Sequence, residues 1–324
     1  MLQTDSGIEF VDAQIAGEII RVITRGVPAL GAQTPAMALQ ELRDNHDDFR
    51  RFVLDPPRGH GDVNAALLLP PFSERAVRTL VVAAQFGFAP LAGTPLIASA
   101  TALVATGAVA SSAPTTEIVF DTAKGLMNVL ALGEDACCHG ARWCTCPPEF
   151  LRRSYGLELE NGSSLPVDVV LAGLPYVLVN ERELGVGSSD IDEIGAFGAT
   201  ISRAAGRQLP MEVLGVAGIT TAYPVLVIGE PKASKNSGTC VPLAWVYANG
   251  TVAKMPAGTG ALAAAAALVD RRQVECGTVI AAVSPFGGEV RSSVGEVGES
   301  ALTATTAMVE ADVTIVSMGR LLGY

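Results

Sequence analysis

Two short turns, each followed by an apolar run, contain the residue types best suited to bind an anion. Residues 92–109 read AGTPLIASATALVATGAV and residues 257–274 read AGTGALAAAAALVDRRQV, and the runs align without gaps when Gly93 is matched to Gly258. Each turn opens a predicted helix, whose first N–H groups have no intrahelical partner and lie at the positive end of the helix dipole. Glycine at these positions lets a ligand approach the backbone closely. The pair therefore predicts a site for a carboxylate or a phosphate.

The two apolar runs also predict the architecture that positions them. A helix that is apolar on every face must be buried on all sides. Two such helices, half a chain apart, predict two similar lobes, each with strands wrapped around one central helix. Apolar spacing predicts a further helix over Ile191–Gln208. Segments rich in β-branched residues and bounded by turn residues predict strands over Val77–Phe88, Glu117–Leu132, Val167–Val179, Leu214–Ile228 and Cys240–Val252.

Length and composition agree with an α/β protein of two lobes. A chain of 324 residues suits two cores of ordinary size. Apolar residues make up 49% of the chain and aromatic residues only 5%, which favours an α/β core over a disulfide scaffold. We expect lobe 1 to contain residues 1–150 and a C-terminal strand at about 310–324, and lobe 2 to contain residues 151–309. The polar stretch 147–161 is interpreted as the linker.

Charge and hydropathy exclude several partners. The net charge is −11, and no run of Lys and Arg is present, so nucleic acid is excluded as the main partner. The N-terminal residues lack a basic segment followed by an apolar one, so no signal peptide is predicted. Residues 95–109 are rich in small residues, which favours a buried helix over a membrane span. We therefore expect no membrane partner, a cytoplasmic location and reduced cysteines.

Four segments resemble the proline racemase superfamily. They are FVDAQIAGEIIRVITRGVP (10–28), DPPRGHGDVNAALLLPP (55–71), FGFAPLAGTPLIASATALVATG (86–107) and GTVAKMPAGTGALAAAAAL (250–268). The similarity spans most of the chain and is poor from about Glu134 to Ala233. It implies a diaminopimelate-epimerase-like fold, with two pseudo-symmetric lobes, a ligand between them and a homodimer.

The departures from the family pattern concern its chemistry. In the family, two cysteines on opposite faces of the substrate exchange the proton at Cα. By the resemblance these positions are Ala92 and Ala257, the histidine after the first of them is Thr94, and the aspartate that contacts a ring nitrogen is Ala253, followed by Lys254. The six cysteines of the chain lie elsewhere.

The backbone of the binding site is retained. Gly93 remains in the first turn and Gly258, Thr259 and Gly260 remain in the second. The resemblance adds two residues that line the substrate pocket, Asn64 and the aromatic Tyr247. His60 and Asp62 belong to a segment that we interpret as orienting the loop before Asn64. The predicted ligand-binding residues are His60, Asn64, Ala92, Gly93, Ala257, Gly258, Thr259 and Gly260.

The missing thiols decide between possible reactions. The α-proton of an amino acid such as proline is very weakly acidic, and one positioned acid or base contributes about 10²–10⁴-fold. We therefore predict a cofactor-independent double-bond isomerase or tautomerase that acts on an activated cyclic imino or amino carboxylate, such as an unsaturated or alkylated pyrroline or proline derivative of a biosynthetic pathway. Two alternatives stay open: a carboxylate-binding paralogue without catalysis, and a 3-hydroxyproline dehydratase or epimerase with a base other than cysteine.

Three side chains are candidate proton carriers. They are Thr94, Tyr247 and Lys254, with Asn64 polarising the imine. Each also has an ordinary interpretation, since Thr94 suits a helix cap, Tyr247 a strand and Lys254 a solvated charge.

Cysteine and histidine are crowded between residues 137 and 146. The spacings of Cys137, Cys138, His139, Cys144 and Cys146 match the common zinc motifs poorly. We interpret the segment as a hairpin with reduced thiols and predict no metal.

Overall fold

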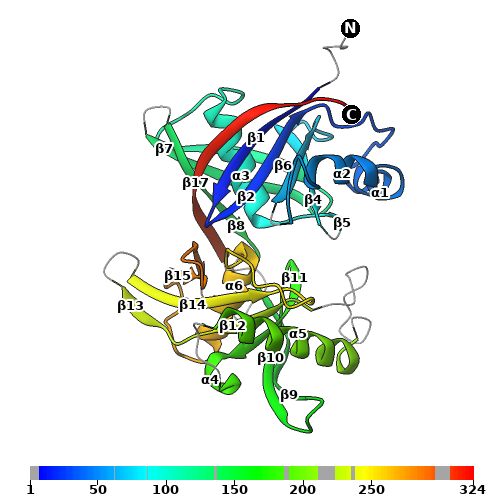
Figure 1. The fold of residues 1–324 in the computed structure, drawn as a ribbon. Helices are drawn as coiled ribbons and strands as arrows, with labels where there is room; N and C mark the ends of the chain where they lie inside the picture. Colours follow the sequence, from blue (N-terminus) through cyan, green and yellow to red (C-terminus); the bar gives the residue numbers. More distant parts are fainter. Residues whose placement is uncertain are drawn as a thin grey trace. The chain divides into compact units, whose positions relative to one another are not determined.

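The chain divides into two compact units. In the computed structural model, unit 1 comprises Met1–Cys144 with Glu310–Tyr324, and unit 2 comprises Thr145–Val309. In Figure 1 unit 1 is coloured from blue to teal with the red C-terminal strand, and unit 2 from green to orange. The structure describes residues 7–61, 63–85, 87–134, 137–185, 190–210, 223–234, 238–295 and 307–324.

Unit 1 encloses one apolar helix, α3, which packs against β1, β2, β3 and β7. The sheet runs through antiparallel β17–β1–β2, parallel β2–β3, antiparallel β3–β4, parallel β4–β6 and antiparallel β6–β7–β8. Its elements are β1 (Ile8–Ile15), β2 (Glu18–Arg25), α1 (Pro35–Asn45), α2 (Asp47–Leu54), β3 (Val63–Leu69), β4 (Arg78–Ala84), β5 (Gly87–Ala89), α3 (Gly93–Ala105), β6 (Thr115–Thr122), β7 (Gly125–Glu134), β8 (Cys137–Thr145) and β17 (Ala307–Leu321).

Unit 2 encloses the corresponding helix, α6, which packs against β10, β11, β12, β14 and β16. Another helix, α5, packs on β9, β11, β12 and β14. The elements are β9 (Glu149–Glu158), β10 (Ser164–Ala172), β11 (Leu174–Asn180), α4 (Glu181–Leu184), α5 (Ile191–Gln208), β12 (Val225–Ile228), β13 (Lys232–Ser234), β14 (Gly238–Val246), α6 (Gly258–Asp270), β15 (Ile280–Val283) and β16 (Glu289–Val294).

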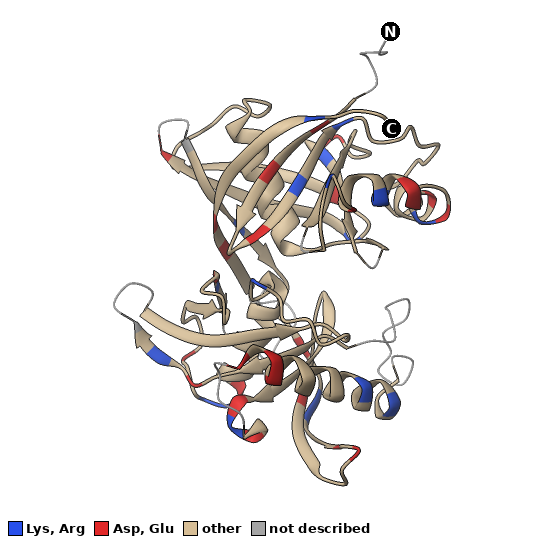
Figure 2. Ribbon diagram, in the orientation of Figure 1, with Lys and Arg blue, Asp and Glu red and all other residues tan. Residues whose placement is uncertain are grey.

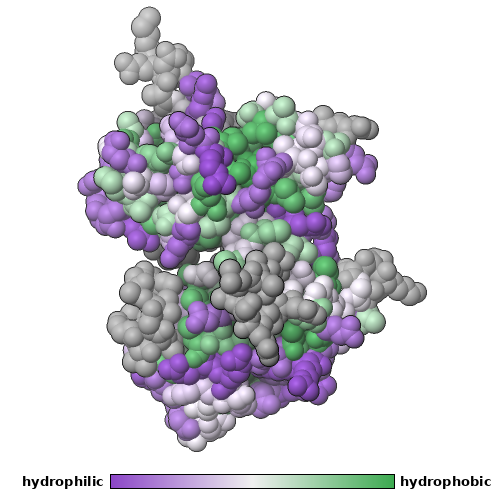
Figure 3. All heavy atoms as spheres, turned by 180° about the vertical axis from the view of Figure 1, so that it is seen from behind, coloured by the Kyte–Doolittle hydropathy of each residue, from purple (hydrophilic) through white to green (hydrophobic). Residues whose placement is uncertain are grey.

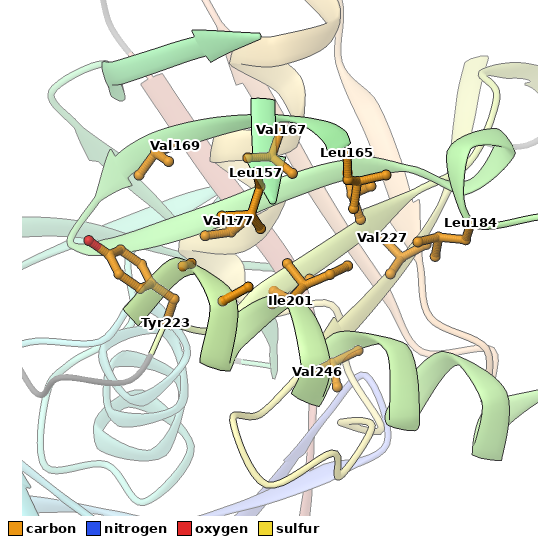
Figure 4. Packing of buried hydrophobic residues seen from close by; sticks show 14 of the residues in the cluster. Leu157, Leu165, Val167, Val169, Val177, Leu184, Ile201, Tyr223, Val227 and Val246 are labelled. Carbon is orange, nitrogen blue, oxygen red and sulfur yellow. The ribbon is translucent and has the colours of Figure 1, made fainter. Parts of the chain in front are cut away.

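Successive side chains of a strand point to opposite faces, so β12 contributes side chains to two cores of unit 2. Val225 and Val227 of β12 join the cluster that includes Ile201 of α5, and Figure 4 shows this packing. Leu226 lies between them in β12 and faces the other way, next to Gly260 of α6. Because both faces of these strands are covered, every residue of β12 is buried.

The helix predictions are confirmed. The helix α5 has the predicted bounds Ile191–Gln208. The two apolar helices begin at Gly93 and Gly258, the glycines matched in the sequence alignment, and each has 13 residues. All residues of α3 except its last are buried, and it contains no charged side chain.

Each predicted strand segment contains β-structure, but some of the segments contain two strands where one was predicted. The segment Glu117–Leu132 is the hairpin β6–β7, and Val167–Val179 is the hairpin β10–β11, each folded at a glycine with positive φ, Gly125 and Gly173. The segment Val77–Phe88 likewise contains β4 and part of β5, Leu214–Ile228 contains β12, with residues 214–222 outside the described part, and Cys240–Val252 contains β14 and a single bridge at Val252.

The predicted linker over residues 147–161 is wrong. Most of it is β9, which pairs with β10. Leu157 is fully buried and Tyr155 packs against the same core, so a few apolar side chains hold the strand while its polar residues face solvent. Unit 2 accordingly starts at Thr145.

Charged residues lie on helices and strands of both units. Figure 2 shows them on α1, α2 and α5, among other elements. In α5 the acidic residues Asp192 and Glu193 lie in the first turn and Arg207 in the last, as the helix dipole favours. On the face shown in Figure 3, hydrophobic areas lie between hydrophilic ones. Among the described residues, no helix has the length and hydropathy needed to cross a membrane.

A buried ion pair fastens the strands of unit 1 to the loop before β3. Asp12 and Arg21 are directly opposite in the β1–β2 pair and form two hydrogen bonds of 2.8 and 3.0 Å. The guanidinium also donates to the carbonyl oxygens of Val53, at the end of α2, and of Arg58, at 2.9 and 2.5 Å. Arg21 therefore fixes the segment that leads to Asn64.

Replacing Arg21 with methionine is expected to destabilise unit 1 by about 3–5 kcal/mol, because the Asp12 carboxylate then stays buried without its partner. The matched control is Arg25→Met in the same strand, where the pair with Glu9 is exposed and 3.8 Å long, so the expected change is about 0.5 kcal/mol or less. The measurement is urea unfolding, monitored by the fluorescence of Trp143 in a Trp245→Phe background, so that the signal reports the stability of unit 1. Equal effects of the two substitutions contradict this account.

Candidate functional site

The first turn of α3 presents backbone N–H groups without a side-chain cap. Ala92 is the N-cap in extended conformation, and its side chain makes no capping hydrogen bond. Pro95, the third residue of the helix, has no N–H to satisfy, which suits an early helical position. Within the described residues, no hydrogen bond occupies the N–H groups of Gly93 and Thr94. These two groups can therefore donate to an anion.

The interpretation of Thr94 as a helix cap is wrong. Thr94 is the second residue of α3, inside the helix, because the helix starts two residues earlier than a cap at this position requires. Its exposed fraction is 5%. As a proton carrier it remains a prediction.

Gly93 is needed for packing within unit 1. A Cβ atom at this position would lie 3.1 Å from two ring carbons of Trp143, a buried residue of β8. The absence of a Cβ atom at Gly93 thus leaves room for the indole ring, and close approach of a ligand to this glycine stays a prediction. The ring holds the first turn of α3 against β8.

The first turn of α6 repeats this arrangement with one more donor. Ala257 is the N-cap without a side-chain hydrogen bond, and its carbonyl oxygen accepts from Ala261 at 2.8 Å. The N–H groups of Gly258, Thr259 and Gly260 thus precede the first intrahelical bond. In the described part of unit 2, none of the three has an acceptor. A Cβ atom on Gly260 would lie 3.2 Å from Leu226, so this glycine also serves packing.

A buried tyrosine contacts the α6 turn. Tyr176 of β11 is 1% exposed, and its hydroxyl lies 2.8 Å from Oγ1 of Thr259. Burial raises the pKa of Tyr176 to about 12, while the hydrogen bond with Thr259 acts in the opposite direction. The phenol therefore keeps its proton at neutral pH. Sequence reasoning missed this residue; a tyrosine inside an apolar strand signals a buried hydroxyl that needs a partner, but not which partner.

Asn64 lies on the β3 face that is turned away from the α1–α2 cluster. Val63, Ala65 and Leu67 belong to the core cluster formed with α1 and α2, so the alternate residues of β3 are on the opposite face, where α3 packs. The side chain of Asn64 is half-buried. The structure therefore places Asn64 and α3 on one side of the unit 1 sheet.

His60 belongs to a tightly folded loop rather than to a buried site. Its side chain is exposed, and its carbonyl oxygen accepts from Gln85 at 3.2 Å and from the Val63 N–H at 3.0 Å. A Cβ atom at the preceding Gly59 would lie 2.1 Å from the carbonyl oxygen of Leu54. Asp62, predicted to act with His60, lies outside the described residues.

Tyr247 and Lys254 flank a short turn that returns to β14. Tyr247 follows the last residue of β14, is half-buried, and packs its ring on Trp245 at a centroid distance of 4.5 Å. Ala253 is buried, and its N–H donates to the carbonyl oxygen of Trp245. Lys254 is exposed. The turn holds Tyr247 and Ala253 beside the same tryptophan.

Two hollows, one in each unit, lie away from the predicted site residues. One of about 440 Å³ in unit 1 adjoins Leu103 and Thr106, at the C-terminal end of α3, and one of about 240 Å³ in unit 2 is lined by β12, β14 and the segment after β15. None of the predicted site residues lines either hollow.

The cysteine-rich segment is strand β8 and the residue after it. Cys144 and Cys146 are exposed, and Cys138 is partly exposed. Across the described ranges, no group of three or more His, Cys, Asp or Glu side chains comes together as a metal site would require.

Comparison with known proteins gives consistent results. The sequence model of the proline racemase family matches residues 10–317. A 4-hydroxyproline 2-epimerase of Agrobacterium fabrum is 26% identical over 323 residues, which is 98% of this chain and 90% of that protein. A trans-3-hydroxy-L-proline dehydratase of Burkholderia ambifaria is 24% identical over 288 residues, covering 88% of this chain and 85% of that protein.

The solved structures agree on the fold. A hydroxyproline epimerase from Agrobacterium vitis, with bound trans-4-hydroxy-L-proline, has a TM-score of 0.83 and 22% identity, covering 99% of this chain and 94% of that one. The predicted α/β fold of the diaminopimelate-epimerase-like type is thereby confirmed.

Alkaline titration tests the environment of Tyr176. The unfolded chain releases this proton near pH 10 and the folded chain near pH 12, so the folded state is expected to lose about 2 kcal/mol of stability from pH 10 to pH 12. Below pH 10 the contribution is fully present. The comparison is urea unfolding of the wild type and Tyr176→Phe at both pH values; the variant should lose correspondingly less. Equal losses would mean that Tyr176 titrates normally.

Proposed function

Because the chain belongs to the proline racemase family, we propose that it binds a small cyclic imino or amino carboxylate and isomerises it by proton transfer without a cofactor. The relatives named above support an isomerase or epimerase type of reaction on proline derivatives. The substrate that fits best is an unsaturated or alkylated pyrroline or proline derivative, whose double bond is moved. A biosynthetic pathway for such units requires this kind of step.

One observation supports the proposal above the others: two uncapped helix N-termini whose first turns carry glycine and threonine but no thiol. The five N–H groups of Gly93, Thr94, Gly258, Thr259 and Gly260 are donors, and a carboxylate is the acceptor that most small metabolites offer.

The alanines at the N-caps determine which reactions are feasible. The proposal places Ala92 and Ala257 at the positions of the two family cysteines. Each lost acid or base removes about 10²–10⁴-fold, so a racemase working at the weakly acidic Cα of proline would lose most of its rate. A conjugated imine has a more acidic proton, which one weaker base can move.

The candidate proton carriers differ in environment. Thr94 is nearly buried inside α3, Tyr247 is half-buried on a tryptophan, and Lys254 is exposed. Asn64, on the strand face where α3 packs, is proposed to polarise the imine. These roles follow from the resemblance and are predictions.

The alternative function is a binding protein without catalysis. Alanine at both proposed acid–base positions is the observation that favours it, because such a site retains its affinity for an acid group after the chemistry is lost. The homodimer and the cytoplasmic location also remain predictions; light scattering of the purified protein tests the first.

Ligand screening by thermal shift tests the binding claim. Pyrrole-2-carboxylate, pyrroline-2-carboxylate and unsaturated alkyl prolines are expected to stabilise the protein in proportion to RT ln(1 + [L]/Kd), about 2.7 kcal/mol at 100 Kd. The matched control is pyrrole-2-carboxamide, which has the same ring without the charge and should have little effect. Equal shifts with the carboxylate and the amide would exclude a carboxylate site.

Solvent-deuterium exchange followed by NMR separates the enzyme from the binding protein. A conjugated carbon of the pyrroline ligand is expected to exchange faster with the protein present than in buffer alone. Thr94→Val, Tyr247→Phe and Lys254→Met are compared, and the variant that lacks the proton carrier should lose about 10²–10⁴-fold in rate. Tight binding without exchange supports the binding protein, and exchange at Cα of proline itself would contradict the exclusion of racemase chemistry.

A further inference from the structure

The hydroxyl of Tyr176 has one partner in the described structure, and that partner is in the first turn of α6. Tyr176 lies on β11 opposite Val170 of β10, with its ring on the face covered by α6. Its oxygen lies 2.8 Å from Oγ1 of Thr259. A buried phenol uses its single proton in a hydrogen bond because leaving it unpaired is costly.

The geometry allows either hydroxyl to donate in this hydrogen bond, and donation by tyrosine is the arrangement that satisfies both groups. If Thr259 were the donor, the Tyr176 proton would need a second acceptor, and the described part of unit 2 offers none. With tyrosine as donor, both hydroxyl groups are satisfied by one arrangement: Tyr176 donates to Thr259, and the threonine proton stays free to bond elsewhere. Thr259 also makes no hydrogen bond to a carbonyl oxygen of the preceding chain within the described residues.

The side chain of Thr259 is held through its hydroxyl, whose oxygen lies 2.8 Å from the Tyr176 hydroxyl. Its methyl group faces Gly173, at 3.6 Å from the place where a Cβ atom would stand. Gly173 is in the tight turn between β10 and β11 and has a φ of 77°, so the turn favours glycine there. Because threonine has few χ1 rotamers, the hydrogen bond with Tyr176 selects the direction of its hydroxyl. The residue is half-buried, so its remaining side is accessible.

We propose that Tyr176 is a positioning residue: by donating to Oγ1 of Thr259, it turns the threonine hydroxyl into a donor for the ligand carboxylate. This inference rests on the proposed carboxylate site and specifies its recognition. One carboxylate oxygen receives the N–H groups of the α6 turn, and the other receives the Thr259 hydroxyl. Charge-assisted hydrogen bonds of this type are stronger than neutral ones.

A double-mutant cycle on ligand affinity tests the inference. Pyrrole-2-carboxylate is titrated calorimetrically into the wild type, Tyr176→Phe, Thr259→Val and the double variant. Thr259→Val should weaken binding about 10-fold or more and Tyr176→Phe about 3- to 10-fold, the range for one hydrogen bond. Because Tyr176 acts through Thr259, the double variant should bind as weakly as Thr259→Val alone.

Two controls separate positioning from a general structural effect. Tyr223→Phe removes another buried tyrosine hydroxyl of unit 2, bonded to the Leu209 carbonyl oxygen at 2.5 Å, and should lower stability while the affinity stays unchanged. Thr259→Ser keeps the hydroxyl and should bind within about 3-fold of the wild type.

The outcomes are distinguishable. If Tyr176→Phe binds like the wild type, or weakens binding equally in the Thr259→Val background, the positioning role is wrong while the proposed function stands. If the wild type does not bind pyrrole-2-carboxylate or the pyrroline carboxylates, the proposed function and this inference are both overturned.

Discussion

Each unit of this protein is built around an apolar helix that must be buried on every side. No charged side chain interrupts α3, and α6 carries one only at its last residue, Asp270. Strands must therefore enclose both helices. Apolar packing leaves the first turn without a capping side chain, since Ala92 and Ala257 have no group that accepts a hydrogen bond. A helix that starts in this way offers its N–H groups to whatever acceptor is present.

The glycines of these turns serve two needs at once. Gly93 and Gly260 leave room for Trp143 and Leu226 inside their own units. The same lack of a Cβ atom keeps the helix start open to a ligand. A Cβ atom at either position would crowd its packing neighbour, so the glycines support a binding site only together with the free N–H groups and the buried Tyr176–Thr259 contact.

The chemistry follows from what surrounds the acid group. Peptide dipoles stabilise a carboxylate but do not remove a proton from carbon, and the N-cap alanines offer no base. A protein with this arrangement is suited to a substrate whose proton is already acidic. The burial of the Tyr176 phenol, which keeps its proton at neutral pH, adds a donor to the site rather than a base.

The sequence predicted features that depend on neighbouring residues, but it did not reveal contacts between residues far apart in the chain. Apolar spacing predicted α5 at its observed bounds, and the internal match predicted the starts of α3 and α6. Tyr176 and Thr259 are 83 residues apart, so no local pattern joins them. Residues 147–161 were misread because their polar side chains face solvent while only Leu157 and a few neighbours hold β9 to the core.

The most direct test of the central claim is a ¹⁵N-NMR titration of the full chain with pyrrole-2-carboxylate. The account predicts that the amide signals of Gly93 and Thr94 in unit 1 and those of Gly258, Thr259 and Gly260 in unit 2 shift as the ligand is added. Signals that stay unmoved at both turns, while the ligand binds and shifts amides elsewhere, would contradict it.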